Sequence, residues 1–395
     1  MLLTGLLPLL ASDPAVAAAA DSIAAGRSGA LVAPSGLRAP IAAHIASRAT
    51  TPVVVLTATG REAEAMTAAL ASWTTGAAAF PAWETLPHER LSPQVDTMAS
   101  RIAVLRRLAH PVQGDAFAGP LSVLVVPVRS FLQPIIRGLA DLEPVRIAVG
   151  DVVDLPEATA RLSDLGYQRV DMVEARGQMS VRGGILDVFP PQEPHPLRVE
   201  LWGDEVDEIR AFSIQDQRTL GAAPHGLWAV PCRELLLSAP VRARAREAAD
   251  RLPGAAEMLS LAAEGIPAPG IESLAPVLAS GMDRLVDLLP PGTPVLASDP
   301  ERIRARAADL VATTDEFLRA AWSAAAGGAQ VPLEASDASF HLEADVSGLE
   351  GNTLGYGVGD FVPGLKIDYK IALKDGSGTP VTGTFMQMNA SDGPH

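Results

Sequence analysis

Two arginines have the residue type and spacing of a protein-docking site. They stand in the segments Tyr167-Gln168-Arg169 and Val181-Arg182-Gly183. A guanidinium offers a planar fork of five N–H donors, and arginine is enriched among the residues that dominate the affinity of protein complexes. Arg169 and Arg182 therefore indicate a surface that binds another protein. The alternative is that both are ordinary charges that protect an edge strand from aggregation.

A second set of candidate residues lies near the C-terminal end. His341 and Glu343 are two residues apart, so their side chains share one face if the segment is a strand. Met388 and His395 follow in the segment MNASDGPH. Imidazole, thioether and carboxylate ligands together suit copper or iron. The alternative is that each of the four residues is there for reasons unrelated to metal.

A phosphate-binding loop is expected after the first strand of an α/β nucleotide-binding fold, and an apolar strand is predicted at residues 29–33. The segment that follows, 33–40, reads APSGLRAP. A working loop of the form GxxxxGK[ST] needs glycines for close backbone approach, a lysine for charge and a hydroxyl for magnesium. Gly36 is the single glycine here, lysine is missing, and Pro40 lacks an N–H donor. The segment predicts no ATP binding, although a nucleotide-binding enzyme stays open as an alternative.

Three further groups favour structural interpretations. His88 and Glu89 have the types of an acid–base pair, but no nucleophile stands near them in the sequence. The acidic run at residues 204–208 is predicted to be a solvated turn between two strands rather than a metal site. Cys232 is the single cysteine, which excludes an internal disulfide and indicates a buried or loop thiol.

The composition predicts a folded chain of two or three domains. Of its 395 residues, 48% are apolar and 19% are charged, a balance that excludes disorder of the whole chain. The net charge of −15 argues against non-specific DNA binding by the whole surface. The apolar segment 1–10 has no basic residue before it, so an amphipathic helix running to Ala25 is predicted rather than a secretory signal. We expect a cytoplasmic protein with no membrane contact.

The elements that must position these residues alternate along the first half of the chain. Helices are predicted at 40–48, 63–72 and 93–108, and strands at 52–57 and 121–128, which is typical of an α/β layer with a parallel sheet. A helix at 156–165 and strands across 178–188, 197–202 and 205–214 then predict an antiparallel α+β unit. Helices return at 241–251 and 300–326, around a strand at 293–297, and the tail is predicted to contain strands without a helix.

The basic residues change type towards the C-terminal end. All 28 arginines lie between Arg27 and Arg319, whereas the lysines are Lys366, Lys370 and Lys374. One domain family rarely changes from arginine to lysine in this way. The sequence therefore predicts a join between unrelated segments near residues 328–338.

Two segments carry a family resemblance. They are FPAWETLPHERLSP at 80–93 and GYQRVDMVEARGQMSVRGGILDVFP at 166–190, the second followed by LRVELWGDEVDEIRAFSIQDQRTL at 197–220. Over about residues 1–330 the chain resembles the N-terminal, UvrB-like module of the bacterial transcription-repair coupling factor family, Mfd, and is similar also to UvrB. The resemblance implies a degenerate RecA-like domain at 1–141 and 223–330, interrupted at 142–222 by an inserted α+β domain that binds UvrA.

The resemblance also implies roles for individual residues. In the family pattern Y-x-R…R-V-R-G, Arg169 and Arg182 take two arginine positions, Ser180 takes the third, and Phe189 is an apolar neighbour. The implied function is an adaptor that recruits UvrA to stalled RNA polymerase in nucleotide excision repair. Full-length members are ATP-dependent DNA translocases, and this chain lacks ATPase and helicase motifs. Contacts with RNA polymerase and DNA are expected through regions absent here, and residues 1–330 are expected to need no cofactor.

The tail resembles a different family. Over about residues 335–395 it is similar to the periplasmic iron-transport-associated metal-binding proteins, which have an Ig-like fold. That resemblance implies copper or iron held by His341, Glu343, Met388 and His395. Because the family's chain continues further, residues 331–395 are expected to form a partial all-β sandwich. A periplasmic copper- or iron-binding protein is the alternative function, and a chimeric reading frame is the simplest account of the two resemblances.

Overall fold

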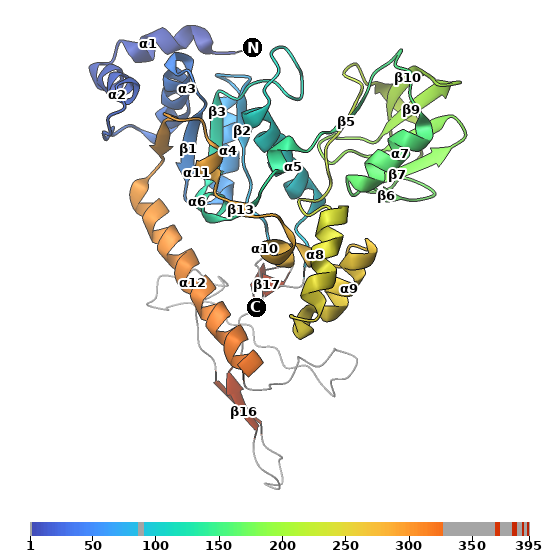
Figure 1. Cartoon of the computed structure of the whole chain (residues 1–395). Coiled ribbons are helices and arrows are strands. Elements are labelled where there is room, and N and C mark those ends of the chain that lie inside the picture. The colour runs from blue at the N-terminus through green and yellow to red at the C-terminus, as the bar shows by residue number, and fades with distance from the viewer. Residues whose placement is uncertain are drawn as a thin grey trace. The chain divides into compact units, whose positions relative to one another are not determined.

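The computed structural model describes residues 2–85, 91–326, 368–371, 381–384, 389–390 and 393–394. It divides into two units, Met1–Ala321 and Trp322–His395. The first unit contains a four-stranded parallel sheet and a six-stranded, mainly antiparallel sheet (Figure 1). The predicted mixed α/β architecture is confirmed for this unit.

The parallel sheet has four strands in the order β14 (Val295–Ala297), β1 (Val53–Thr57), β3 (Val123–Pro127) and β2 (Ala77–Ala79). Every neighbouring pair is parallel. The central strands, β1 and β3, are nearly continuous runs of valine and leucine. Such runs are typical of strands that helices cover on both faces.

Helices cover both faces of the parallel sheet because successive side chains of each strand point to opposite sides. Val55 belongs to an apolar cluster with α3 (Arg38–Arg48) and α4 (Gly60–Leu70). Val54, the next residue, belongs to the cluster formed with α5 (Val95–Ala109) on the other face. The helices predicted in this half of the chain are therefore confirmed, with small shifts of their ends.

Two predictions for the N-terminal segment were wrong. The segment 29–33 is in no strand: Leu31 packs on the core while Val32 is 99% exposed, and the backbone joins no ladder. The predicted continuous helix is instead α1 (Leu7–Ala11) and α2 (Pro14–Ala24). Asp13 breaks it, because its carboxylate accepts hydrogen bonds from the first N–H groups of the second helix.

Among the described residues, no single helix is both long enough and apolar enough to cross a membrane. In the part of the chain that the structure describes, one pair of helices, Thr4–Ala11 and Pro14–Ala24, reaches that length and composition together, and the pair is bent by 97°.

The six-stranded sheet forms the α+β unit predicted from strand and turn signals. Its order is β11 (Thr219–Ala222), β10 (Glu205–Phe212), β9 (Leu197–Trp202), β8 (Ile185–Val188), β7 (Gln178–Arg182) and β6 (Gln168–Arg169). All neighbours are antiparallel except β6 and β7. α7 (Leu155–Asp164) packs through Leu162 on one face of this sheet, against a core that includes Met179 and Val199.

A two-stranded stem connects this unit with the rest of the chain. β5 (Val145–Ile147) leads into the unit and β12 (Leu227–Ala229) leads out, and the two strands pair antiparallel. The chain therefore leaves and rejoins the parallel-sheet part at one place.

The remaining elements complete the first unit. The helices are α6 (Val128–Leu132), α8 (Ala239–Ala249), α9 (Ala256–Glu264), α10 (Ala275–Leu278), α11 (Leu285–Leu288) and α12 (Pro300–Ala326), which also extends into the second unit. The short 3-10 helices are η1 (Thr4–Leu6), η2 (Ser35–Leu37), η3 (Leu139–Asp141), η4 (Pro253–Ala255) and η5 (Ile271–Leu274). β4 (Ile135–Ile136) pairs with β13 (Met282–Asp283).

The second unit is described in short segments only. β15 (Asp368–Ile371) pairs antiparallel with β16 (Val381–Thr384), and β17 (Asn389–Ala390) pairs antiparallel with β18 (Gly393–Pro394). These pairs are strands, as predicted for the tail. An Ig-like sandwich stays a prediction.

Candidate partner-binding surface

The two arginines singled out in the sequence both lie at one edge of the six-stranded sheet. Arg169 is exposed in the edge strand β6, and Arg182 ends the neighbouring strand β7 with 53% of its side chain exposed. Both line a single hollow of about 510 Å³. Its other lining residues are Val170, Asp171, Ser180 and Val181. Two residues that are 13 positions apart in the sequence therefore line one hollow.

A buried carboxylate fixes the direction of Arg182. The Arg182 Nη2 atom donates to Asp187 Oδ2 at 2.9 Å, and Asp187 is only 1% exposed. Arg198 donates to both oxygens of the same carboxylate, at 2.7 and 2.9 Å, and its guanidinium lies 4.6 Å from the centre of the Phe212 ring. The hydrogen bond with Asp187 raises the pKa of Arg198. Asp187 thus holds the Arg182 guanidinium in one direction.

Arg169 and Ser180 differ from Arg182 in their surroundings. Within the described residues Arg169 has no carboxylate partner, so its donors face solvent. Ser180 is 2% exposed, and its hydroxyl donates to the Asp171 carbonyl oxygen at 2.9 Å. Ser180 therefore forms the floor of the hollow and adds no charge to it.

Phe189 lies beneath this surface and not on it. It is 6% exposed and packs with Val173 and Phe212. The Arg176 guanidinium lies 5.1 Å from the centre of its ring. Phe189 can act on a partner only through the loop that it supports.

The candidate metal ligands of the tail, His341, Glu343, Met388 and His395, lie outside the described residues, as do His88 and Glu89. In the part of the chain that the structure describes, no group of three or more His, Cys, Asp or Glu side chains has the arrangement of a metal site. The acidic run at 204–208 was predicted to be a solvated turn, but only Asp204 lies in the turn between β9 and β10, because residues 205–208 belong to β10 itself.

Cys232 is a buried thiol, as predicted, with 1% of its surface exposed. Burial raises the pKa of this thiol to about 12, so it stays protonated at neutral pH. The neighbouring Tyr167 hydroxyl donates to the Val230 carbonyl oxygen at 3.0 Å. Both groups belong to the core below the sheet and offer no nucleophile.

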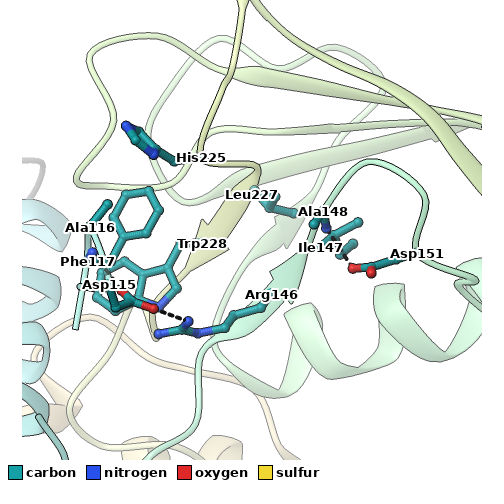
Figure 2. A pocket seen from close by; sticks show the side chains of 10 residues that line it. All are labelled: Asp115, Ala116, Phe117, Arg146, Ile147, Ala148, Asp151, His225, Leu227 and Trp228. Carbon is teal, nitrogen blue, oxygen red and sulfur yellow. Dashed lines mark hydrogen bonds and ion pairs between the residues drawn. The ribbon is translucent and has the colours of Figure 1, made fainter. Parts of the chain in front are cut away.

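A second hollow, of about 210 Å³, lies where the loop after α5 meets the β5–β12 stem (Figure 2). Phe117 stacks on Trp228 with ring centres 5.0 Å apart, and His225 approaches Phe117 edge-on at 6.0 Å. Asp115 accepts a 2.6 Å hydrogen bond from Arg146. Burial alone raises the pKa of Asp115, but hydrogen bonds from the Ala118 and Phe117 N–H groups and from Arg146 outweigh it and lower the pKa. These contacts join the inserted unit to the parallel-sheet part.

A buried ion pair that was not predicted from the sequence packs against the FPAWE segment, residues 80–84. The Arg101 Nε atom donates to Glu234 Oε1 at 2.6 Å, and neither side chain has any exposed area. The Trp83 indole N–H donates to the same oxygen at 2.9 Å, and the Arg101 guanidinium lies 4.4 Å from the centre of the Phe80 ring. Nothing in the sequence signals this pair, because Arg101 and Glu234 are 133 positions apart.

Two family models match parts of this chain. Residues 145–226 match the family model of the UvrB interaction domain. This range runs from β5, the first strand of the stem, to the residue before β12, and includes the whole six-stranded sheet. Residues 321–395 match a second family model, described as Fe2+ transport protein.

Relatives of the N-terminal part are transcription-repair-coupling factors. The protein of Mycobacterium bovis is 49% identical over 332 residues, which cover 80% of this chain and 27% of the relative. That of Myxococcus xanthus is 34% identical over 309 residues, covering 72% and 25%. That of Escherichia coli is 32% identical over 139 residues, covering 35% and 11%. The chain spans about a quarter of the length of the first two. The resemblance predicted for the N-terminal part is confirmed.

Proposed function

We propose that the inserted unit of this chain is a docking module for UvrA, and that the chain recruits UvrA in transcription-coupled nucleotide excision repair. The match of residues 145–226 to the UvrB interaction domain supports this proposal. The single observation that carries it is the hollow that Arg169 and Arg182 share at the β6–β7 edge.

The geometry suits an acidic or carbonyl-rich element of a partner. Two arginines line one hollow, and bidentate hydrogen bonds from a guanidinium to a carboxylate are among the strongest that proteins make. Because Asp187 already orients Arg182, binding costs less side-chain entropy than ordering a free arginine. Charge-assisted contacts at an exposed rim also predict that binding weakens as salt is added.

We infer an adaptor and not an ATPase because residues 33–40, the segment that the sequence predicted as a phosphate loop, lack the lysine and second glycine of GxxxxGK[ST]. This segment forms η2 and the start of α3, and the Arg38 guanidinium donates to Ser298 Oγ at 3.1 Å. The parallel sheet with its covering helices supports a degenerate RecA-like domain. We assign contacts with RNA polymerase and DNA to parts of the longer relatives that this chain does not match, and place its activity in the cytoplasm.

The test is surface plasmon resonance of the full chain on immobilised UvrA. We expect saturable binding that falls at least thirtyfold in Arg169→Ala/Arg182→Ala, since truncating an interface hot spot costs about 2 kcal/mol or more. The matched control is Arg218→Ala/Arg304→Ala, which removes two arginines exposed elsewhere. No binding by folded wild type would overturn the proposal. An unchanged affinity of the first variant would place the site elsewhere.

A second candidate function belongs to the tail, and the family-model match of residues 321–395 favours it. We propose that His341, Glu343, Met388 and His395 bind copper or iron. Elemental analysis of the chain dialysed against each metal should give one ion per chain, lost in His341→Ala/Met388→Ala. Equal metal content in wild type and variant would refute this assignment.

A further inference from the structure

Trp202 is an unusual residue for a hairpin tip because it buries almost nothing. It ends β9, and 86% of its surface is exposed. Gly203, with φ +64°, follows directly and turns the chain into β10. The hairpin is paired on both sides of this turn, so the indole is presented to solvent by a fixed backbone. Exposed tryptophan on an ordered scaffold is typical of interface anchors.

Strand register places Trp202 in a row with two other exposed residues. Trp202 pairs with Glu205 across the hairpin, and Glu205 forms a bridge with Val152 on its other side. Paired residues on neighbouring strands share a face. Val152 is 80% exposed. The row therefore consists of two apolar side chains on either side of a carboxylate.

The same face also carries Arg182. Arg182 pairs with Ile185, Ile185 with Glu200, and Glu200 with Glu208. Glu200 and Trp202 are two residues apart on one strand, so both rows lie on one side of the sheet. α7 packs on the other side. From strand spacing and rise, the Cα atoms of Arg182 and Trp202 are about 12 Å apart.

The surface charge is positive at the β6–β7 edge around Arg182 and negative at the β9–β10 tip around Trp202. Residues 148–157 and 199–209 contain eight carboxylates and no lysine or arginine. Arg210 neutralises two of them, Glu200 and Glu208. The exposed Asp204, Glu205 and Asp207 stay around the tip without an ion-pair partner in the described chain. The tip is thus an apolar centre with an acidic rim, whereas the β6–β7 edge is basic.

We propose that the β9–β10 tip is a second contact on the same partner, and that it receives a basic, apolar element of UvrA. This inference rests on the proposed function and adds the chemistry of the partner. UvrA must then present an acidic group to Arg169 and Arg182, and a lysine or arginine beside an apolar side chain to Trp202. Trp202 suits such an element because indole is the best aromatic acceptor of a cation. The acidic rim disfavours DNA as the occupant, since phosphates would be repelled.

The experiment measures UvrA binding to the full chain by surface plasmon resonance. Trp202→Ala should weaken binding at least tenfold, and Trp202→Phe should keep most of the affinity. Asp204→Lys/Glu205→Lys should weaken binding further, by reversing the charge of the rim. The matched control is Leu220→Ala, which removes a 53% exposed apolar side chain from the opposite edge strand of the same sheet. Because Trp202 is exposed, its variants should keep the wild-type thermal midpoint.

The outcomes separate this inference from the proposed function. If wild type binds, and Arg169→Ala/Arg182→Ala abolishes binding while Trp202→Ala binds as wild type does, the second contact is refuted alone. If wild type does not bind UvrA, both proposals fall. A rim reversal that strengthens binding would also refute a basic partner element.

Discussion

The buried ion pair between Arg101 and Glu234 gives the sharpest stability prediction. The substitution Glu234→Gln keeps the side-chain volume and removes a carboxylate charge that accepts hydrogen bonds from Arg101 and Trp83. Neither partner has exposed side-chain area, so water cannot replace the lost interaction. Removing one partner of such a pair costs about 3–5 kcal/mol, because the other charge stays buried without compensation. Glutamine can still accept from the Trp83 indole, so we expect about 3 kcal/mol.

The assay is urea unfolding of the full chain, followed by tryptophan fluorescence and by circular dichroism. A loss of about 3 kcal/mol corresponds to a thermal midpoint lower by roughly 4–5 °C for a unit that spans Met1–Ala321. The matched control, Asp287→Asn, breaks an exposed ion pair with Arg284 and should leave the midpoint unchanged.

A double variant separates the charge from the packing. Arg101→Met/Glu234→Leu removes both charges, and its stability should exceed that predicted by adding the two single losses. Strict additivity, or a Glu234→Gln variant as stable as wild type, would refute the account of a paired, water-free charge.

Two further predictions follow from shifted pKa values. Burial raises the pKa of Cys232 from its ordinary value of 9.0 to about 12. The thiol should therefore react with a disulfide reagent at pH 8 far more slowly in the native chain than in urea. The stability that it contributes is complete below pH 9 and is lost as pH rises towards 12, so Cys232→Ala should reduce the alkaline slope of the unfolding free energy. The pKa of Asp115 is lowered, so its contribution is complete above the unfolded value and is lost as pH falls through the folded value. Asp115→Asn should lower the thermal midpoint at pH 7, and this loss should shrink as pH falls below the unfolded pKa; a loss that stays the same as pH falls would contradict this sign.

Local patterns predicted most of the fold. The valine-rich runs of β1 and β3 and the spacing of the helices around them gave the parallel layer, because periodicity is written in neighbouring residues. The same patterns failed at residues 29–33, where an apolar run looked like a strand. Whether such a run pairs depends on a neighbouring strand that lies elsewhere in the chain.

The candidate site was predicted only in part. Residue type and family pattern selected Arg169 and Arg182, but not the hollow that joins them or the carboxylate of Asp187 that holds one of them. Phe189 was expected beside the arginines and is buried under the surface instead. Trp202 carried no signal, because exposure at a hairpin tip is a property of the folded sheet.

The sequence alone predicted which segments are helices and which are strands. It also predicted that the chain consists of two parts with different family resemblances, and it selected Arg169 and Arg182 as candidate binding residues. These depend on composition, period and short motifs, which the chain carries locally. Only the tertiary structure decided which residues share a face. It placed Arg182 and Trp202 on the same side of one sheet, and brought Arg101 to Glu234 across 133 residues. Such contacts arise from strand register and packing, and neither is encoded at a single position.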